Sequence, residues 1–191
     1  VIRYYIEASD NDGQTSYSPF GASSMDNPDF SFYTVRNGGL VIEDLQKVLN
    51  LSQDASPYEG QKVTVTGVVT ASAKAYDLEA IYIQDPSSSA WGGIQCVNNS
   101  ELIKLYRGQE VEVTGTVSES FGFTQLSVED VTLTGEIKTV EPVAIDLNDT
   151  AIFTTRALEM YEGMLVGLTN PGGKVAVSNP RLNAFGEWLV G

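Results

Sequence analysis

Two stretches, YEGQKVTVTGVV at residues 58–69 and YRGQEVEVTGTV at residues 106–117, are near copies of each other, with the same residue at 8 of 12 positions. After a turn glycine, valines alternate with polar residues in both copies, which is the pattern of a strand with one buried face. The valines expected to face inward are Val63, Val65, Val111 and Val113. The alternation slips by one residue at Gly67 and at Gly115, as a β-bulge or a tight bend requires.

The sequence around these copies predicts a small closed barrel over residues 58–140. The expected strands are 61–72, 80–84, 92–97, 109–118 and 124–133. A short helix is expected at 101–105, between the third and fourth strands, with Ser100 as its N-cap. This order matches the OB-fold, a five-stranded Greek-key barrel, and it makes the two near copies neighbouring strands. The chain is therefore predicted to be all-β, with an OB-fold barrel flanked by partial β domains.

Shorter units precede the barrel. Residues 1–35 have the pattern of the last strands of a β-sandwich domain, with DNDG at residues 10–13 as a hairpin turn. Residues 36–57 are expected to be a linker with one helix, whose apolar side chains would pack on the barrel. Those apolar residues are Ile42, Leu45, Val48 and Leu49.

Residues 141–191 are predicted to begin a second OB-like or β unit that is incomplete. A helix capped by threonine is expected at 154–160, followed by Tyr-Glu-Gly at 161–163, the same three residues that open the first barrel at 58–60. Both ends of the chain fall inside strand-like runs. We therefore expect this chain to be a fragment of a larger protein.

Composition excludes several classes of function. The chain has 11 Lys and Arg against 25 Asp and Glu, a net charge of −14, and it has no histidine. Ser-His-Asp and Cys-His catalysis and the usual zinc sites are therefore excluded, and no catalytic residue is expected. Cys96 lies in an apolar run and is expected in the core. No apolar run reaches membrane-spanning length, so no membrane contact is expected. The acidity suits a secreted or cell-surface protein, and equally serves solubility.

Ligands of OB-folds lie on the second and third strands, between the loops that follow the first and fourth strands. The candidate ligand residues are Lys74, Tyr76, Tyr82, Trp91, Phe121 and Phe123. Aromatic rings there stack on bases or sugars, or they pack inside and close the barrel, and both interpretations stay open. Residues 58–136 hold four basic and eleven acidic residues, a net charge of −7. Strong nucleic-acid binding is not expected, because it needs clustered Lys and Arg, whereas carbohydrate stays open.

Four aspartates are candidate calcium ligands, although the sequence requires no cofactor. They are Asp10, Asp12, Asp77 and Asp85. The DNDG stretch begins like a calcium loop, but Gly21 stands where the closing glutamate of an EF-hand would be. A plain hairpin turn and solvated carboxylates are the alternative interpretations.

Three segments, residues 57–71, 81–85 and 108–126, together resemble the OB-like module that precedes the catalytic domain in secreted bacterial extracellular nucleases of the endonuclease/exonuclease/phosphatase type. Residues 161–166 and 185–187 are similar to the segment that follows this module, so the resemblance covers about residues 40–191. The first 35 residues look like the end of a fibronectin-III-like or immunoglobulin-like domain. The nuclease fold needs a histidine and metal-binding carboxylates in its own domain, so the resemblance carries no catalytic residue onto this chain.

We therefore expect a non-catalytic module of a secreted multidomain bacterial protein. The resemblance implies a metal-dependent nuclease as the parent, with this module as a spacer or accessory domain in contact with neighbouring domains. Two alternatives stay open. One is a module that binds carbohydrate or single-stranded nucleic acid, and the other is a structural module of a surface adhesin or filament.

Overall fold

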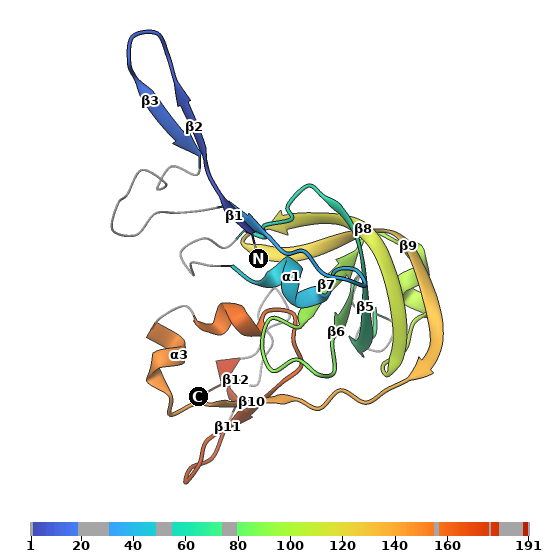
Figure 1. Cartoon of the computed structure of the whole chain (residues 1–191). Helices are drawn as coiled ribbons and strands as arrows, with labels where there is room; N and C mark the ends of the chain where they lie inside the picture. The colour runs from blue at the N-terminus through green and yellow to red at the C-terminus, as the bar shows by residue number, and fades with distance from the viewer. Residues whose placement is uncertain are drawn as a thin grey trace.

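Five strands close into a barrel, which lies on the right of Figure 1. The computed structural model describes residues 2–18, 31–48, 55–73, 80–154, 157–175, 177–179 and 189–190. The barrel strands are β5 (Lys62–Ala71), β6 (Ile81–Gln84), β7 (Gly93–Val97), β8 (Gln109–Ser120) and β9 (Phe123–Ile137). Their order is β5-β6-β7-β9-β8, with β8 returning to β5, and only the β7–β9 pair is parallel. This is the OB-fold order, so the predicted fold is confirmed.

The two near copies pair with each other, as predicted. In the antiparallel β5–β8 register, Val65 lies opposite Val113, Val63 opposite Gly115, and Gly67 opposite Val111. Each glycine therefore faces a valine of the other copy. The valines expected to face inward are all buried in the core.

The predicted slip of the alternation does not occur in either copy, because Gly67 and Gly115 are buried in phase with the valines before them. The β8–β9 register does shift beside Gly115, but the residue that it skips is Glu129, so the bulge lies in β9. At Gly67 the β5–β8 register runs on without a shift, and the irregularity of β5 lies further along, between Val69 and Ala71. A Cβ on Gly67 would come within 3.0 Å of Cδ1 of Ile42, so this glycine makes room for the helix that covers the barrel.

That helix is α1 (Ile42–Gln46), which contacts β5 and β7. Ile42 and Leu45 are fully buried and Val48 is buried, which confirms the predicted apolar face. The helix is shorter than expected, because Lys47 already has an extended backbone, and Leu49 lies outside the described residues. At its N-terminal end, Oδ2 of Asp44 accepts hydrogen bonds from the Val41 amide (3.0 Å) and from Nε of Arg36 (2.7 Å).

The predicted helix between the third and fourth strands is a 3-10 helix, η2 (Ser100–Lys104), with Leu102 buried against the core. Its N-cap is Asn99, so the prediction of Ser100 as the cap was wrong. The Asn99 side chain reaches forward and accepts a hydrogen bond from the Glu101 amide at 2.9 Å. Ser100 is itself the first residue of the helix, where its backbone is already helical.

The N-terminal residues form two small antiparallel pairs. β1 (Ile2–Tyr4) pairs with β4 (Ser31–Tyr33), and β2 (Ile6–Ser9) pairs with β3 (Thr15–Ser18) in a hairpin that projects from the barrel (Figure 1). The predicted hairpin turn at residues 10–13 is therefore confirmed. Tyr58 links this unit to the barrel, because its hydroxyl accepts a hydrogen bond from the Thr34 amide (3.0 Å). That these strands end a β-sandwich domain stays a prediction.

After the barrel, β10 (Val143–Asp146) pairs in parallel with β11 (Val166–Thr169). The single helix expected at 154–160 is instead two short helices between these strands, α3 (Thr150–Thr154) and η3 (Ala157–Tyr161). The last described strands, β12 (Val177–Asn179) and β13 (Leu189–Val190), pair with each other. A second OB-like unit stays a prediction. Within the described ranges, no helix is long and apolar enough to cross a membrane.

Candidate functional site

A polar groove of about 610 Å³ lies on the outer side of β6, β7 and β9. Its position follows from strand alternation: Ile81, Ile83, Ile94 and Cys96 point into the core, so the residues between them point outward. The residues that line the groove are Ala80, Tyr82, Gln95, Val97, Asn98, Asn99, Ser120 and Gln125. None of these described residues is charged, although the chain as a whole carries a net charge of −14.

Side-chain hydrogen bonds hold the floor of the groove in place. Nε2 of Gln95 donates to the hydroxyl of Tyr82 at 3.1 Å, across the β6–β7 pair. Nδ2 of Asn98 donates to Oγ of Ser127 at 3.1 Å. Nε2 of Gln125 lies 3.4 Å from Oγ of Ser118, at the long end of the hydrogen-bond range. Amides and hydroxyls both donate and accept, so this surface can meet ligand hydroxyls in either role.

Two of the predicted aromatic residues come together beside the groove. The rings of Tyr82 and Phe123 are 6.4 Å apart and nearly perpendicular, which is a favourable edge-to-face geometry. Burial raises the pKa of Tyr82, so its phenol stays protonated at neutral pH. Phe121 and Phe123 were both predicted to lie in the loop after the fourth strand. Phe121 does lie there, at the tip of the β8–β9 hairpin, with a positive φ of 55° and a fully exposed ring. Phe123 belongs to β9 and not to the turn.

Trp91 lies elsewhere. Together with the serines of the β6–β7 turn, it lines a second groove of about 590 Å³. Arg36, Glu43, Lys47 and Asp85 also line this groove. The aromatic candidates therefore do not form one platform. Lys74 and Tyr76, predicted to frame the ligand face, lie outside the described residues.

The predicted calcium ligands are not gathered into one site. Oδ1 of Asp10 accepts hydrogen bonds from the amides of Asp12 and Gln14, both at 2.9 Å, within the β2–β3 hairpin. Oδ1 of Asp85 accepts from the amide and the hydroxyl of Ser87, at 2.8 and 2.7 Å. Asp77 lies outside the described residues. No group of three or more His, Cys, Asp or Glu that could hold a metal ion occurs in the described part of the chain, and calcium binding stays a prediction.

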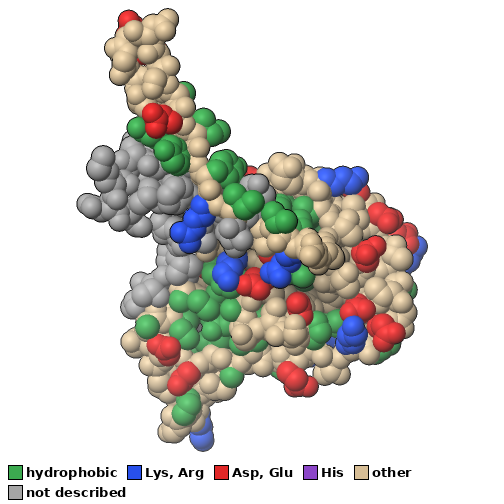
Figure 2. Space-filling model, viewed as in Figure 1, with side chains coloured by type: hydrophobic (Ala, Val, Ile, Leu, Met, Phe, Trp, Pro, Cys, Tyr) green, Lys and Arg blue, Asp and Glu red, His purple; other side chains and the backbone are tan. Residues whose placement is uncertain are grey.

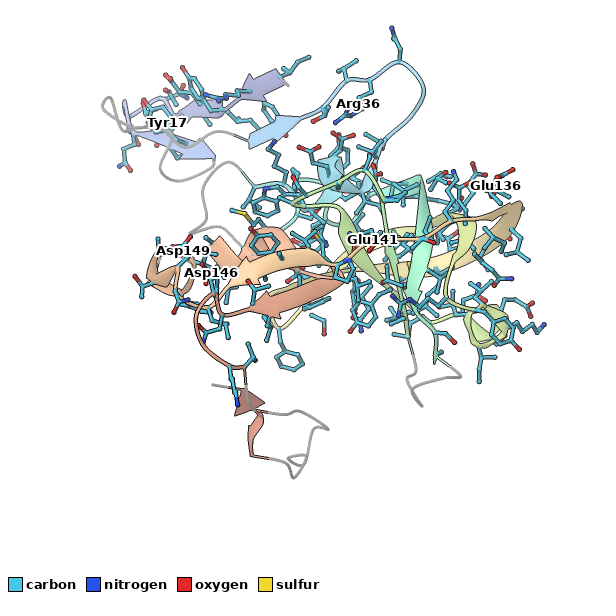
Figure 3. The ribbon with its side chains drawn as sticks, turned by 90° about the horizontal axis from the view of Figure 1, so that it is seen from below. Tyr17, Arg36, Glu136, Glu141, Asp146 and Asp149 are labelled. Atoms are coloured by element: carbon cyan, nitrogen blue, oxygen red, sulfur yellow. The ribbon has the colours of Figure 1, made fainter. Side chains whose placement is uncertain are left out.

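The basic side chains are spread out, and five of the eight that the structure describes are paired with acids. Figure 2 shows Lys and Arg on the visible face as separate spots among Asp and Glu. The ion pairs are Arg36–Asp44, Lys47–Glu43, Lys62–Glu129, Lys104–Glu101 and Lys138–Glu110. The carboxylates labelled in Figure 3 are likewise spread out, from Glu136 near the end of β9 to Asp146 and Asp149 beside α3. This surface offers no basic track for a phosphate backbone among the residues described.

Sequence reasoning missed the amide residues of the groove. Gln95 and Gln125 lie directly opposite each other in the parallel β7–β9 pair, and Asn98 follows β7. The signal for Gln95 was present, because it lies in an apolar run next to Cys96, which was expected in the core. The predicted ligand residues were aromatic or charged, so these uncharged polar residues were not among them.

No protein-family model matches this chain, and no match was found among the curated proteins. Partial matches were found among solved structures. The hypothetical protein ygiW from E. coli matches with a TM-score of 0.31 and 15% identity, over 40% of this chain and 77% of that protein. A domain of replication protein A from Methanococcus maripaludis matches with a TM-score of 0.32 and 19% identity, over 42% of this chain and 88% of that domain.

Asparaginyl-tRNA synthetase from Pyrococcus horikoshii matches with a TM-score of 0.36 and 18% identity, over 55% of this chain. The match spans only 24% of the length of that enzyme. Identities and TM-scores this low say nothing about the function of this chain.

Proposed function

We propose that the barrel is a non-catalytic binding module and that its groove over β6, β7 and β9 takes a short, uncharged, polyhydroxylated ligand, that is, an oligosaccharide. The observation that carries this proposal is the lining of the groove. Its described lining residues are amides, hydroxyls and small apolar groups, in a chain with 25 acidic residues. A groove without charged side chains offers no partner for a charged ligand, so it favours an uncharged one.

The chemistry of the lining also fits a sugar. A sugar hydroxyl donates one hydrogen bond and accepts others, and the side chains of Gln95, Gln125 and Asn98 supply both partners. The ring of Tyr82 adds an apolar surface beside these amides, held by its hydrogen bond to Gln95 and by Phe123. Ligand sites typically combine a few fixed polar groups with aromatic surface in this way.

Single-stranded nucleic acid is disfavoured. Binding of a phosphate backbone depends on clustered Lys and Arg and on the release of counterions, and the described lining of the groove contains neither residue. Secretion, the nuclease parent and the role as a spacer rest on the sequence resemblance alone, and we retain them as proposals about the larger protein.

Isothermal titration of the full chain with neutral hexasaccharides of glucose, xylose and N-acetylglucosamine tests the proposal. The comparison ligands are an oligogalacturonate and a dT oligonucleotide, at low and high salt. We expect one neutral hexasaccharide to bind with weak salt dependence, and the two polyanions not to bind. Absence of binding by every neutral hexasaccharide, or salt-sensitive binding of the oligonucleotide, would contradict the proposal.

Variants locate the site. Tyr82→Ala and Gln95→Ala should each weaken binding by about tenfold. That is the loss expected when one stacked ring, or the hydrogen bonds of one side chain to a polar ligand, are removed. Tyr106→Ala is the matched control, because Tyr106 is 53% exposed and does not line the groove. Equal affinity of Tyr82→Ala, Gln95→Ala and the control would place the ligand elsewhere.

A further inference from the structure

We infer that residues 160–165 form a cover that docks on the outer face of β6 and β7, next to the open groove. We further infer that this contact limits the open groove to a short ligand. The docking contact stands on the structure alone. The limit on ligand length rests on the proposed function.

The covered half continues the groove along the same two strands. Tyr82 and Gln84 are two residues apart on β6, and Gln95 and Gly93 are two residues apart on β7, so each pair points to the same outer side. Gln84 is directly opposite Gly93, as Tyr82 is opposite Gln95. The outer face thus has an open half around Tyr82 and a second half around Gln84. Gln84 is only 1% exposed, although it points away from the core cluster.

Residues 160–165 cover Gln84 through three hydrogen bonds to separate parts of the barrel. The Leu165 amide donates to Oε1 of Gln84 at 2.7 Å. The Trp91 amide, in the β6–β7 turn, donates to the carbonyl oxygen of Met160 at 2.6 Å. The Thr124 amide, at the start of β9, donates to Oε1 of Glu162 at 2.9 Å. The cover therefore spans β6, the turn and β9, and it is held at both of its ends and in its middle.

Two glycines allow the backbones to touch at the centre of this contact. A Cβ on Gly93 would lie 2.4 Å from the carbonyl carbon of Gly163, and a Cβ on Gly163 would lie 2.9 Å from the carbonyl carbon of Gly93. No side chain fits on either residue without separating the two segments. Gly163 also has a φ of +67°, which favours glycine. Nε2 of Gln46 in α1 donates to the Gly93 carbonyl at 2.6 Å and holds that backbone in place.

Glu162 brings an acidic side chain of the cover against the barrel, at the Thr124 amide. Burial raises the pKa of its half-buried carboxyl, and the charges of Glu159 and of Glu119 in β8 raise it further. The charge of Glu162 in turn raises the pKa of Tyr82 in β6. The neighbours of Glu162 from α1 and β9, Gln46 and Thr124, are uncharged. Oε1 of Glu119 accepts hydrogen bonds from the Ser56 amide and the Thr124 hydroxyl, both at 2.8 Å. Because burial and both glutamates disfavour the charged form of Glu162, ionisation of this carboxyl weakens docking.

Hydrogen exchange of the full chain, followed by NMR, tests the docking without any ligand. We expect the amides of Trp91, Thr124 and Leu165 to be protected, and Gly163→Ala to raise their exchange rates together by about tenfold or more. The amides of Val65 and Val113, in the barrel wall, should keep their rates. Gly172→Ala is the control, because Gly172 has a φ of +86° but nothing within 4 Å of its Cβ position. It should leave all five amides unchanged.

Gln84→Ala provides a second variant in case Gly163→Ala misfolds. It removes only the acceptor of the Leu165 amide, so that amide should exchange faster while Val65 and Val113 do not change. Rapid exchange of the three docking amides in the wild type, or unchanged protection in both variants, would overturn the docking.

The limit on ligand length is tested separately. In Gly163→Ala the ratio of hexasaccharide affinity to trisaccharide affinity should rise above that of the wild type, since a longer face is open. An unchanged ratio, with docking lost, would contradict the limit on length. If neither chain binds any saccharide, the proposed function fails, and the exchange rates still decide whether the cover docks.

Discussion

The glycines at the same place in the two near copies, Gly67 and Gly115, should respond very differently to replacement by alanine. A Cβ on Gly115 would lie 2.4 Å from the carbonyl oxygen of Ser127, which is backbone of the neighbouring strand. A Cβ on Gly67 would meet only side-chain atoms, at 3.0 Å from Cδ1 of Ile42 and 3.1 Å from Cβ of Ile83. The sequence repeat predicts equal effects, whereas the structure predicts unequal ones.

The size of each effect follows from what must move. In Gly115→Ala the β8–β9 bulge has to separate, and we expect a loss of about 3 kcal/mol in the free energy of unfolding, at the upper end for overpacked sites. In Gly67→Ala the tip of Ile42 and the side chain of Ile83 must each shift by a few tenths of an ångström. We expect a loss of about 1 kcal/mol there, partly offset by the lower entropy of the unfolded chain.

Urea denaturation of the full chain, followed by far-ultraviolet circular dichroism, measures both values. Gly167→Ala is the control, because its Cβ would make an ordinary contact 3.5 Å from Cβ of Pro142, and it should change the barrel transition by less than about 0.5 kcal/mol. Equal losses for the two repeat glycines, or a larger loss for Gly67→Ala, would refute the close contact of Gly115 with the β9 backbone and the helix contact of Gly67.

Three further predictions concern single side chains. Burial raises the pKa of Cys96 to about 12, so iodoacetamide should label it only as fast as the barrel unfolds; rapid labelling would contradict a buried thiol. Asn99→Ala should lower the free energy of unfolding in urea by about 1 kcal/mol, and Ser100→Ala should leave it almost unchanged. A larger loss for Ser100→Ala than for Asn99→Ala would show that Ser100 is the cap. Burial raises the pKa of Glu162 from 4.5 to about 7, so docking of residues 160–165 is strongest below pH 4.5 and weakens as the pH rises through 7. The loss, on the order of 1 kcal/mol for a half-buried group, should appear as faster exchange of the Leu165 amide after correction for the intrinsic rate, and Glu162→Gln should remove it.

Much of the barrel could be predicted because its strands carry strictly periodic patterns. Val63 and Val65 alternate with exposed polar residues, and this alternation gives both the strand and its buried face. The pairing of the two copies followed from the OB-fold order, in which the first and fourth strands are neighbours. The same sequence signal, a glycine after alternating valines, could not distinguish a bulge from a helix contact. That distinction depends on Ile42, which is distant in the sequence.

The candidate site was harder to predict because its residues come from strands that meet only in the folded barrel. Gln95 and Gln125 are neighbours only because β7 and β9 pair in parallel. Trp91 has the right residue type and lies close to the third strand, but the β6–β7 turn carries it into another groove. The contact of Gly163 with Gly93 joins two backbones and leaves no trace in residue type beyond the glycines themselves.

The most direct test of the account is an amide NMR titration of the full chain with the neutral hexasaccharide that binds best. The account predicts that the shifts concentrate at Tyr82, Gln95 and Gln125 and stop at Gln84 and Gly93, where residues 160–165 cover the face. Shifts centred on the groove around Trp91 and Arg36, or spread evenly over both halves of the face, would contradict it.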